Sequence, residues 1–300
     1  MKPSILISSH FAYFNVRTGM TLFTKHIAEY LSQYYEVSVH TLRDVSNDIV
    51  IKNNVTYLTG NHWSGHHDLT IGHAPHQRGC DIQLIDSVRY LDQYDPSAIT
   101  IASTDTIKQA LKLNTDVLNP IVYPAHHKTA RGNKITMIGL SDAKGGDIIT
   151  ALAKSNPDIE FLGVRSGWQA TSQPTPNLPN LELMDEVTDM KLIWSKTKLL
   201  LVGGIEQYGM AGVEASVSGI PTIALDCVGS REALQEAATF VPSKDVSLWN
   251  ELLHSVLGNY QHHVMLTKAR SDRIDSIKQL SKLKEIIDNE HNHFERAKYI

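Results

Sequence analysis

Residues 199–225 read LLLVGGIEQYGMAGVEASVSGIPTIAL, and this stretch decides the fold. An apolar strand leads through a glycine-containing turn into a helical run, and a second apolar strand follows Pro221. Glu206 and Glu214 lie eight positions apart, one on each side of Gly209. The N-terminus of a helix that opens at such a turn binds phosphate through its free N–H groups and its dipole. Because a carboxylate one or two turns further on can hold sugar hydroxyls, the stretch predicts a ligand that carries both a phosphate and a sugar.

The composition is that of a globular protein with two domains. A chain of 300 residues exceeds the usual size of one domain, and 42% hydrophobic with 20% charged residues is ordinary for soluble proteins. The net charge of −4 argues against a partner bound mainly through a phosphate backbone. We expect Cys80 and Cys227 to be free thiols. No stretch reaches the ~20 apolar residues that span a bilayer, and the N-terminus turns polar too soon for a signal peptide, so we expect a cytoplasmic protein.

The first 130 residues alternate between strands and helices. Apolar residues recur every three to four positions from Met20 to Leu31, which predicts one helix, and residues 104–113 predict another. Short apolar runs predict strands at residues 5–7, 37–39, 55–58, 69–71, 99–101 and 121–123. Such alternation is typical of a mostly parallel sheet covered on both faces.

A polar segment at residues 126–133 predicts a linker, after which the alternation begins again. Residues 166–179 predict an exposed or ligand-facing loop. Further strands are predicted at residues 135–138, 159–164, 199–202 and 222–225, and helices at residues 147–154, 185–196 and from 246 almost to the end. We therefore divide the chain into an N-terminal domain at residues 1–130, a second domain at 131–265, and C-terminal helices at 266–300 that pack back toward the N-terminal domain.

The polar candidates for a functional site follow predicted strands. In open parallel sheets, ligands bind at the carboxyl ends of the strands. Two such domains that face each other predict a shared site in the cleft between them. The residues at predicted strand ends are Ser9-His10, His73, Gly139, Arg165 and Glu206.

Five short motifs, which follow one another between residues 144 and 232, resemble motifs of the retaining glycosyltransferases of family 4. KGGD at residues 144–147 looks like the family's Lys-Gly step, and FLGVRSGW at residues 161–168 is similar to a strand and loop of one subgroup. Residues 206–214 match the Glu-x7-Glu signature. GIPTIA at residues 219–224 and GSRE at residues 229–232 resemble its Gly-x-Pro-Val-Ile-Ala and Gly-x-x-Glu motifs. The resemblance implies an α/β protein of the GT-B fold, with two Rossmann-like parallel-sheet domains facing each other across a cleft. The chain would be a short member with a reduced N-terminal acceptor domain.

The resemblance also implies roles for individual residues. The donor would be a sugar nucleotide such as a UDP-, GDP- or ADP-sugar, bound mainly by the second domain, and no cofactor is implied. Glu206 takes the position of a glutamate that contacts the transferred sugar, and Glu214 that of one that bonds the ribose hydroxyls. Lys144 matches a lysine that neutralises the leaving diphosphate, and His73 a histidine that faces the transferred sugar. The rest of the implied donor site is backbone, at Gly19, Gly209, Met210 and Ala211.

One position departs from the family pattern. Many members carry an arginine where this chain has Leu140, and we expect Arg165 to compensate, because arginine binds phosphate in a bidentate manner. Cationic side chains and a helix N-terminus would then stabilise the anionic leaving group without a metal. The histidines around His73 are irregularly spaced and no cysteine pair accompanies them, so we expect no metal site.

The sequence thus predicts a metal-independent enzyme that moves a hexosyl or pentosyl group, with retention, to a hydroxyl of a saccharide or glycoconjugate. A phage-type enzyme that glycosylates hydroxymethylated DNA bases is an alternative. Residues 1–130 hold ten Lys and Arg against eleven Asp and Glu, and so lack the basic excess of a duplex-binding domain. A non-catalytic sugar-nucleotide-binding protein, which Leu140 would fit, and a phosphorylase or nucleotide-sugar epimerase of similar fold also stay open.

Overall fold

The computed structural model describes residues 2–15, 17–43, 48–60, 65–73, 79–166 and 176–297. The chain divides into two compact units. Unit 1 comprises Met1–Ile121 together with Asp275–Ile300, and unit 2 comprises Val122–Ile274. Each unit has its own sheet, as the restart of the strand and helix alternation predicts.

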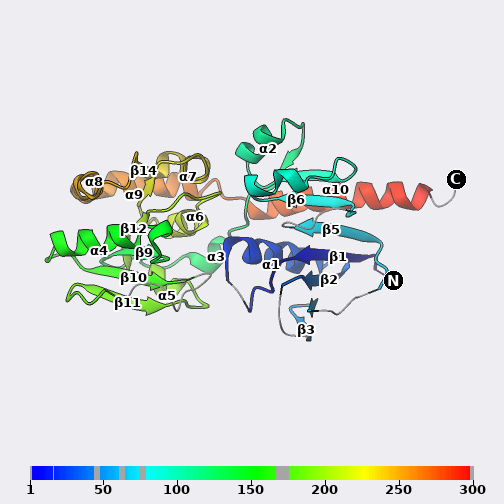
Figure 1. Ribbon diagram of the computed structural model, residues 1–300, viewed down its shortest axis with the longest axis horizontal. Coiled ribbons are helices and arrows are strands. Elements are labelled where there is room, and N and C mark those ends of the chain that lie inside the picture. Colours follow the sequence, from blue (N-terminus) through cyan, green and yellow to red (C-terminus); the bar gives the residue numbers. More distant parts are fainter. Residues whose placement is uncertain are drawn as a thin grey trace. The chain divides into compact units, whose positions relative to one another are not determined.

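The sheet of unit 1 is parallel except at one edge. Its strands are β1 (Ser4–Ser9), β2 (Glu36–Thr41), β3 (Ile49–Lys52), β4 (Val55–Thr59), β5 (Leu69–His73), β6 (Ile82–Ile85), β7 (Ile99–Ala102) and β8 (Asp116–Val117). Their order is β3-β4-β2-β1-β5-β6-β7-β8, and part of this arrangement is visible in Figure 1. Among these strands, only β3 pairs in the antiparallel sense, with β4. Asn53 and Asn54 in the turn between them both have positive φ, 51° and 61°, which a tight two-residue hairpin needs.

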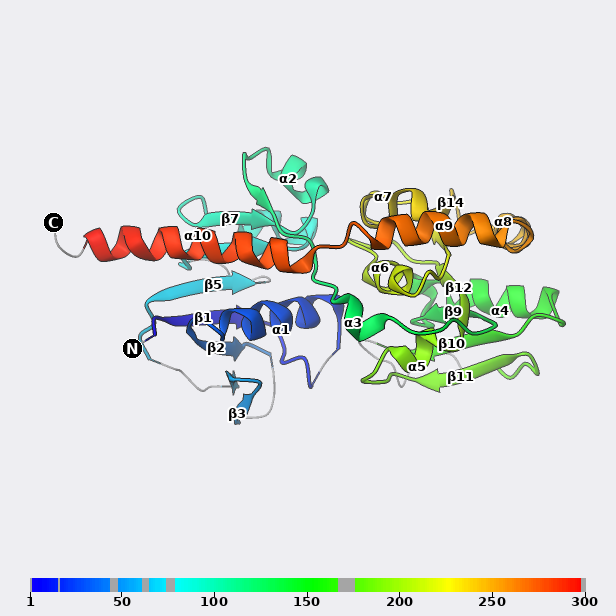
Figure 2. The same ribbon diagram turned by 180° about the vertical axis from the view of Figure 1, so that it is seen from behind.

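The helices of unit 1 include the C-terminal helix of the chain. They are α1 (Gly19–Leu31), η1 (Val88–Gln93), α2 (Asp105–Leu111) and α10 (Ser276–Ala297). Figure 2 shows α10 running beside α1, and the Tyr30 hydroxyl lies 3.1 Å from Ser281 Oγ. Leu280, Leu283 and Ile287 of α10 are buried. These contacts make α10 part of unit 1, although it follows unit 2 in the sequence.

The sheet of unit 2 is parallel and buried on both faces. Its strands are β9 (Lys134–Ile138), β10 (Phe161–Arg165), β11 (Leu181–Asp185), β12 (Thr197–Val202), β13 (Thr222–Leu225) and β14 (Ala238–Val241), in the order β11-β10-β9-β12-β13-β14. Leu199 and Leu201 belong to one apolar core cluster, and Leu200 and Val202 to the other. Because side chains alternate between the faces of a strand, this run of four apolar residues fills both layers.

The helices of unit 2 begin with α3, which precedes the first strand of the unit, and the others connect its strands or follow them. They are α3 (Pro124–His127), η2 (Asp142–Lys144), α4 (Gly146–Ser155), α5 (Lys191–Trp194), α6 (Met210–Val217), α7 (Val228–Leu234), η4 (Gln235–Ala237), α8 (Val246–Gly258) and α9 (Tyr260–Ser271). Trp249, Leu253 and Val256 of α8 are buried in the core cluster that holds Leu199 and Leu201. Trp194 of α5 belongs to the cluster on the other face.

Two predicted elements are wrong. The prediction of one helix over residues 185–196 fails because Asp185 ends β11, where it pairs with Arg165 of β10, and α5 is only a single turn. The predicted strand at residues 121–123 is a connection, in which Ile121 ends unit 1 and Val122 begins unit 2. Prolines precede and follow this segment, and a proline has no N–H group to donate to a sheet.

Strands β3, β6, β8, β11 and β14 are not predicted by the apolar runs. In β6 the break in the pattern is Gln83, a buried amide whose Nε2 donates to Asp95 O and to Thr100 Oγ1, both at 2.7 Å. The sheet therefore accepts this polar residue because its hydrogen bonds are satisfied. In β3 the apolar residues Ile49 and Ile51 are exposed at the edge.

Candidate functional site

In unit 2, two loops touch at the carboxyl end of the sheet through glycine backbones. The loop after β9 contains Gly145, and the loop after β12 begins with Gly203 and Gly204. A Cβ atom on Gly145 would lie 2.8 Å from Gly203 Cα, and one on Gly204 would lie 2.8 Å from Ala143 O. Side chains essentially never come so close, so glycine is needed on both sides of this contact. Gly145 also has a φ of +92°, which other residues adopt at a cost.

This contact places Lys144 beside Glu206. The distance from Lys144 Nζ to Glu206 Oε1 is 2.7 Å, and the two side chains are 45% and 21% exposed. An ion pair this open to solvent stabilises a fold by only about 0–1 kcal/mol. The pair is therefore available to a ligand at little cost in stability.

The backbone of Glu206 is held from its other side by the start of α7. The Glu206 N–H donates to Cys227 Sγ at 3.5 Å, and Cys227 Sγ lies 3.7 Å from Glu206 O and 3.2 Å from Ser230 Oγ. A Cβ atom on Gly229 would lie 2.1 Å from Glu206 O, so the two backbones are in direct contact. Cys227 is a free thiol, as expected, and so is Cys80.

Helix α6 opens at Gly209 with a φ of +42°, and no side chain among the described residues caps its first turn. Met210 and Ala211 lie in that turn, so their N–H groups point away from the body of the helix and toward a potential ligand. One turn further on, Glu214 is buried, and this burial raises the pKa of its carboxyl to about 8.

Glu214 Oε2 lies 3.6 Å from Nδ1 of His127 on α3. Trp194 Nε1 donates to the same His127 nitrogen at 3.4 Å. A protonated Glu214 carboxyl has one O–H to donate and oxygens to accept, which suits it to bond neutral hydroxyl groups.

Arg165 lies at the same edge of the sheet, at the end of β10. Its NH2 atom is 2.5 Å from Asp185 Oδ1, and the Asp185 side chain is 75% exposed. Arg165 Nε is buried and has no hydrogen-bond partner within the described ranges. Leu140 is a buried core residue. It packs against Gly163, where an added Cβ atom would lie only 3.0 Å from Leu140 Cδ1. The position that is often arginine in family 4 thus fills the core here.

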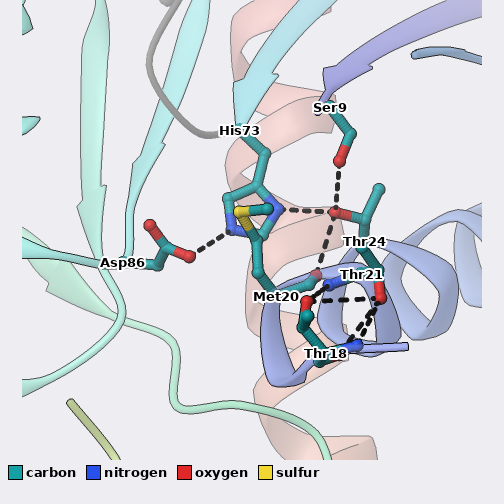
Figure 3. Close-up of polar contacts among 7 residues, drawn as sticks. All are labelled: Ser9, Thr18, Met20, Thr21, Thr24, His73 and Asp86. Atoms are coloured by element: carbon teal, nitrogen blue, oxygen red, sulfur yellow. Dashed lines mark hydrogen bonds and ion pairs between the residues drawn. The ribbon is translucent and has the colours of Figure 1, made fainter. Parts of the chain in front are cut away.

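In unit 1, a chain of polar contacts leads from β1 to the end of β6 (Figure 3). His73 ends β5, and its Nδ1 lies 2.6 Å from Thr24 Oγ1 of α1. Ser9 Oγ, at the end of β1, is 3.3 Å from the same threonine oxygen. On the other side of the ring, His73 Nε2 is 3.5 Å from Asp86 Oδ2. Phe23 packs edge-on to the imidazole, with the ring centroids 5.4 Å apart.

His73 is therefore a buried link in this chain. The residue is 1% exposed, and its two nitrogens face Thr24 and Asp86. Gly19 is the first residue of α1, directly after Thr18, which caps the helix in a reciprocal pair with Thr21 (Figure 3). The sequence singles out His73 and Gly19 but does not single out Asp86.

Some expectations fall partly outside the described residues. Within the described ranges, no three His, Cys, Asp or Glu side chains lie close enough together to hold a metal ion. No helix in these ranges has the length and apolarity to cross a membrane. His62 and His76, and Trp168 of the predicted loop, lie outside the described residues.

Comparison with known proteins finds similarity in structure rather than in sequence. No family model matches the chain, and no curated protein sequence is similar to it. The Anabaena protein HepE in complex with UDP and glucose is similar in structure to this chain, with a TM-score of 0.74 and 14% sequence identity. The similarity covers 95% of this chain and 99% of the HepE chain. A glycosyltransferase from Rickettsia africae has a TM-score of 0.72 and 13% identity, covering 96% and 98%. WaaG, a glycosyltransferase involved in lipopolysaccharide biosynthesis, has a TM-score of 0.70 and 13% identity, covering 94% and 99%.

The chain has a GT-B fold. The predicted fold class is confirmed, with one mostly parallel sheet in unit 1 and one parallel sheet in unit 2. In this GT-B chain, the structure brings Lys144 and Glu206 into contact and places Gly209, Met210 and Ala211 at the start of α6. It leaves Arg165 paired with Asp185 and puts His73 in the other unit. Membership of family 4 and the roles of these residues stay predictions.

Proposed function

We propose that this protein is a retaining glycosyltransferase that moves a sugar from a nucleotide-diphosphate sugar to a hydroxyl of a saccharide or glycoconjugate. The observation that carries the proposal is the Lys144–Glu206 pair, built by glycine contacts at the carboxyl end of a parallel sheet. Ligands of open α/β sheets bind at this edge. HepE, which has the same fold, is known in complexes with UDP and with UDP-glucose, and this supports a UDP-sugar as the first donor to test.

The positive groups of unit 2 suit a leaving diphosphate. As the bond to the sugar breaks, negative charge grows on the diphosphate, and donors aimed at that charge lower the barrier. Lys144 Nζ is exposed enough to exchange its contact with Glu206 for a phosphate oxygen. The first turn of α6 adds N–H groups and the positive end of a helix dipole. Arg165, at the end of β10, is the second cation of the proposal. These groups supply the charge that a metal ion would otherwise supply.

In this proposal, the two glutamates bind different parts of the donor. Once Lys144 binds phosphate, the Glu206 carboxylate is released to bind the transferred sugar. Glu214 is buried one turn inside α6, and its raised pKa favours the neutral carboxyl near pH 7. A neutral carboxyl bonds ribose hydroxyls without adding an anion next to the diphosphate.

A donor screen tests the proposal. Thermal unfolding is followed with UDP-, GDP-, ADP- and TDP-sugars, because a ligand at a hundred times its dissociation constant stabilises the fold by about 2.7 kcal/mol. We expect one class to stabilise the wild type and Lys144→Met to lose most of that effect. No stabilisation by any of them would refute the proposed donor.

The stereochemistry is tested separately once a donor is known. NMR of the glycosylated product should show the anomeric configuration of the donor, and inversion would exclude the retaining mechanism. Binding of donor without hydrolysis or transfer would instead point to a non-catalytic sugar-nucleotide-binding protein.

A further inference from the structure

Asp86 carries a feature that the fold alone does not explain. It directly follows β6, at the carboxyl end of the sheet of unit 1, and its side chain is 15% exposed. Its Oδ1 atom is buried and has no hydrogen-bond partner within the described part of the chain. An unpaired buried carboxylate oxygen costs free energy, and such atoms are rare unless a ligand, a water or an ion satisfies them.

The other carboxylate oxygen of Asp86 faces a histidine. Oδ2 lies 3.5 Å from His73 Nε2, and the opposite ring nitrogen is 2.6 Å from Thr24 Oγ1. The Thr24 hydroxyl donates to Met20 O at 3.2 Å, so Thr24 Oγ1 can accept from His73 Nδ1. Ser9 Oγ contacts the same threonine oxygen (Figure 3), and Phe23 packs against the imidazole ring. Asp86 therefore lies at the end of a buried chain of polar contacts, with Oδ2 near His73 and Oδ1 without a partner among the described residues.

We propose that Asp86 binds a hydroxyl group of the acceptor saccharide and that His73 is its positioning residue. This inference rests on the proposed glycosyl transfer. The free oxygen is an acceptor only, so its ligand must be a donor, and a sugar hydroxyl is a neutral donor that needs no counter-charge.

The charge of the groups around Asp86 suits a different ligand from the donor nucleotide. A diphosphate needs cations and N–H groups, and in unit 2 these are Lys144, Arg165 and the start of α6. A carboxylate at Asp86 would instead repel a diphosphate. The saccharide that Asp86 binds is therefore one without phosphate at this position.

The two aspartates that flank β6 make a matched test. Asp81 precedes the strand, and its Oδ2 accepts from Thr70 N at 2.6 Å and from Thr70 Oγ1 at 2.7 Å. Asp86→Asn keeps the volume of the side chain but replaces a charged acceptor. Because Oδ1 has no partner to lose, the melting temperature of Asp86→Asn should equal or exceed that of the wild type. Asp81→Asn should melt at a lower temperature, because it weakens two existing hydrogen bonds.

Saccharide binding is measured by saturation-transfer NMR with UDP present. The probes are methyl α-D-glucopyranoside, methyl α-D-mannopyranoside and methyl β-D-galactopyranoside at millimolar concentration. We expect at least one to bind the wild type and Asp81→Asn, and Asp86→Asn to bind it about tenfold more weakly. Thr24→Val should weaken binding as well, and Thr24→Ser should restore it, because the serine hydroxyl can again form a hydrogen bond with His73.

The outcomes separate this inference from the proposed function. If all three probes fail to bind the wild type, or if Asp86→Asn binds them equally well, the inference is wrong. A clear loss of stability in Asp86→Asn would also overturn it, because the carboxylate would then be structural. The donor screen is run on the same samples. If no nucleotide sugar stabilises the wild type, the proposed function fails as well, whereas unchanged donor binding in Asp86→Asn leaves that function intact.

Discussion

Gly229 offers the sharpest test of the site around Glu206. A Cβ atom on Gly229 would lie 2.1 Å from Glu206 O, and real Cβ atoms stay at least 3.0 Å from such neighbours, so Gly229→Ala must open this contact by about 0.9 Å. Misplacement of a reacting group by about 1 Å can reduce turnover about 100-fold. The overpacking costs about 1–3 kcal/mol, from which the better helix propensity of alanine in α7 recovers at most about 1 kcal/mol. We therefore expect a folded protein with a large loss of turnover.

Gly258→Ala is the matched control, since Gly258 is also a helical residue and a Cβ atom there would meet nothing within 4 Å. It should leave turnover unchanged and keep or slightly raise the free energy of unfolding. The assay is the rate of nucleoside-diphosphate release from the donor found by the thermal screen, with stability measured by urea denaturation. If Gly229→Ala turns over at the wild-type rate, then the position of the Glu206 loop does not matter and the reasoning fails.

Further expectations concern the charged groups of unit 2. Burial raises the pKa of Glu214 to about 8 from an ordinary value of 4.5, so between these pH values the folded state holds a proton that the unfolded state has lost. The free energy of unfolding should therefore fall from pH 4.5 toward pH 8 more steeply in the wild type than in Glu214→Gln, and parallel denaturation profiles would contradict this. Lys144→Met should reduce turnover about 10²- to 10³-fold with less than about 1 kcal/mol lost in stability, whereas the exposed Lys154→Met should change neither in the same assays. Arg165→Ala should reduce turnover far more than stability, because its partner Asp185 is largely exposed, and an unchanged rate would remove Arg165 from the site.

The fold could be predicted where strands are apolar and buried, and less well elsewhere. Residues 199–202 fill both faces of a central strand, so their side chains leave no other interpretation. Strand β6 was hidden by Gln83, whose polarity is compensated by partners on other segments that the local pattern does not reveal. The false helix at residues 185–196 has the same cause, because the pairing of Asp185 with Arg165 is set by the sheet rather than by neighbouring residues.

The candidate site, too, could be predicted where its residues follow apolar strands. Glu206 and Lys144 each follow an apolar strand, and strand order then brings them together, since β12 lies beside β9. Asp86 also follows a strand, but that strand was not recognised, so the residue was missed. The missed strand is thus the reason for the missed residue. The residues next to Cys227 do not indicate its contact with Glu206, because the two residues are 21 positions apart in the sequence.

The position of Glu206 depends on glycines more than on its own side chain. Gly203 and Gly204 let its loop touch the loop that carries Lys144, and Gly229 lets the start of α7 touch its carbonyl. Each of these contacts joins backbone to backbone, so a methyl group at any of them must move one loop relative to the other. Replacing the glutamate, in contrast, removes a carboxylate and leaves the loops where they are. Changes at the glycines should therefore alter the rate through geometry, and changes at Glu206 through chemistry, which a KM and kcat comparison can separate.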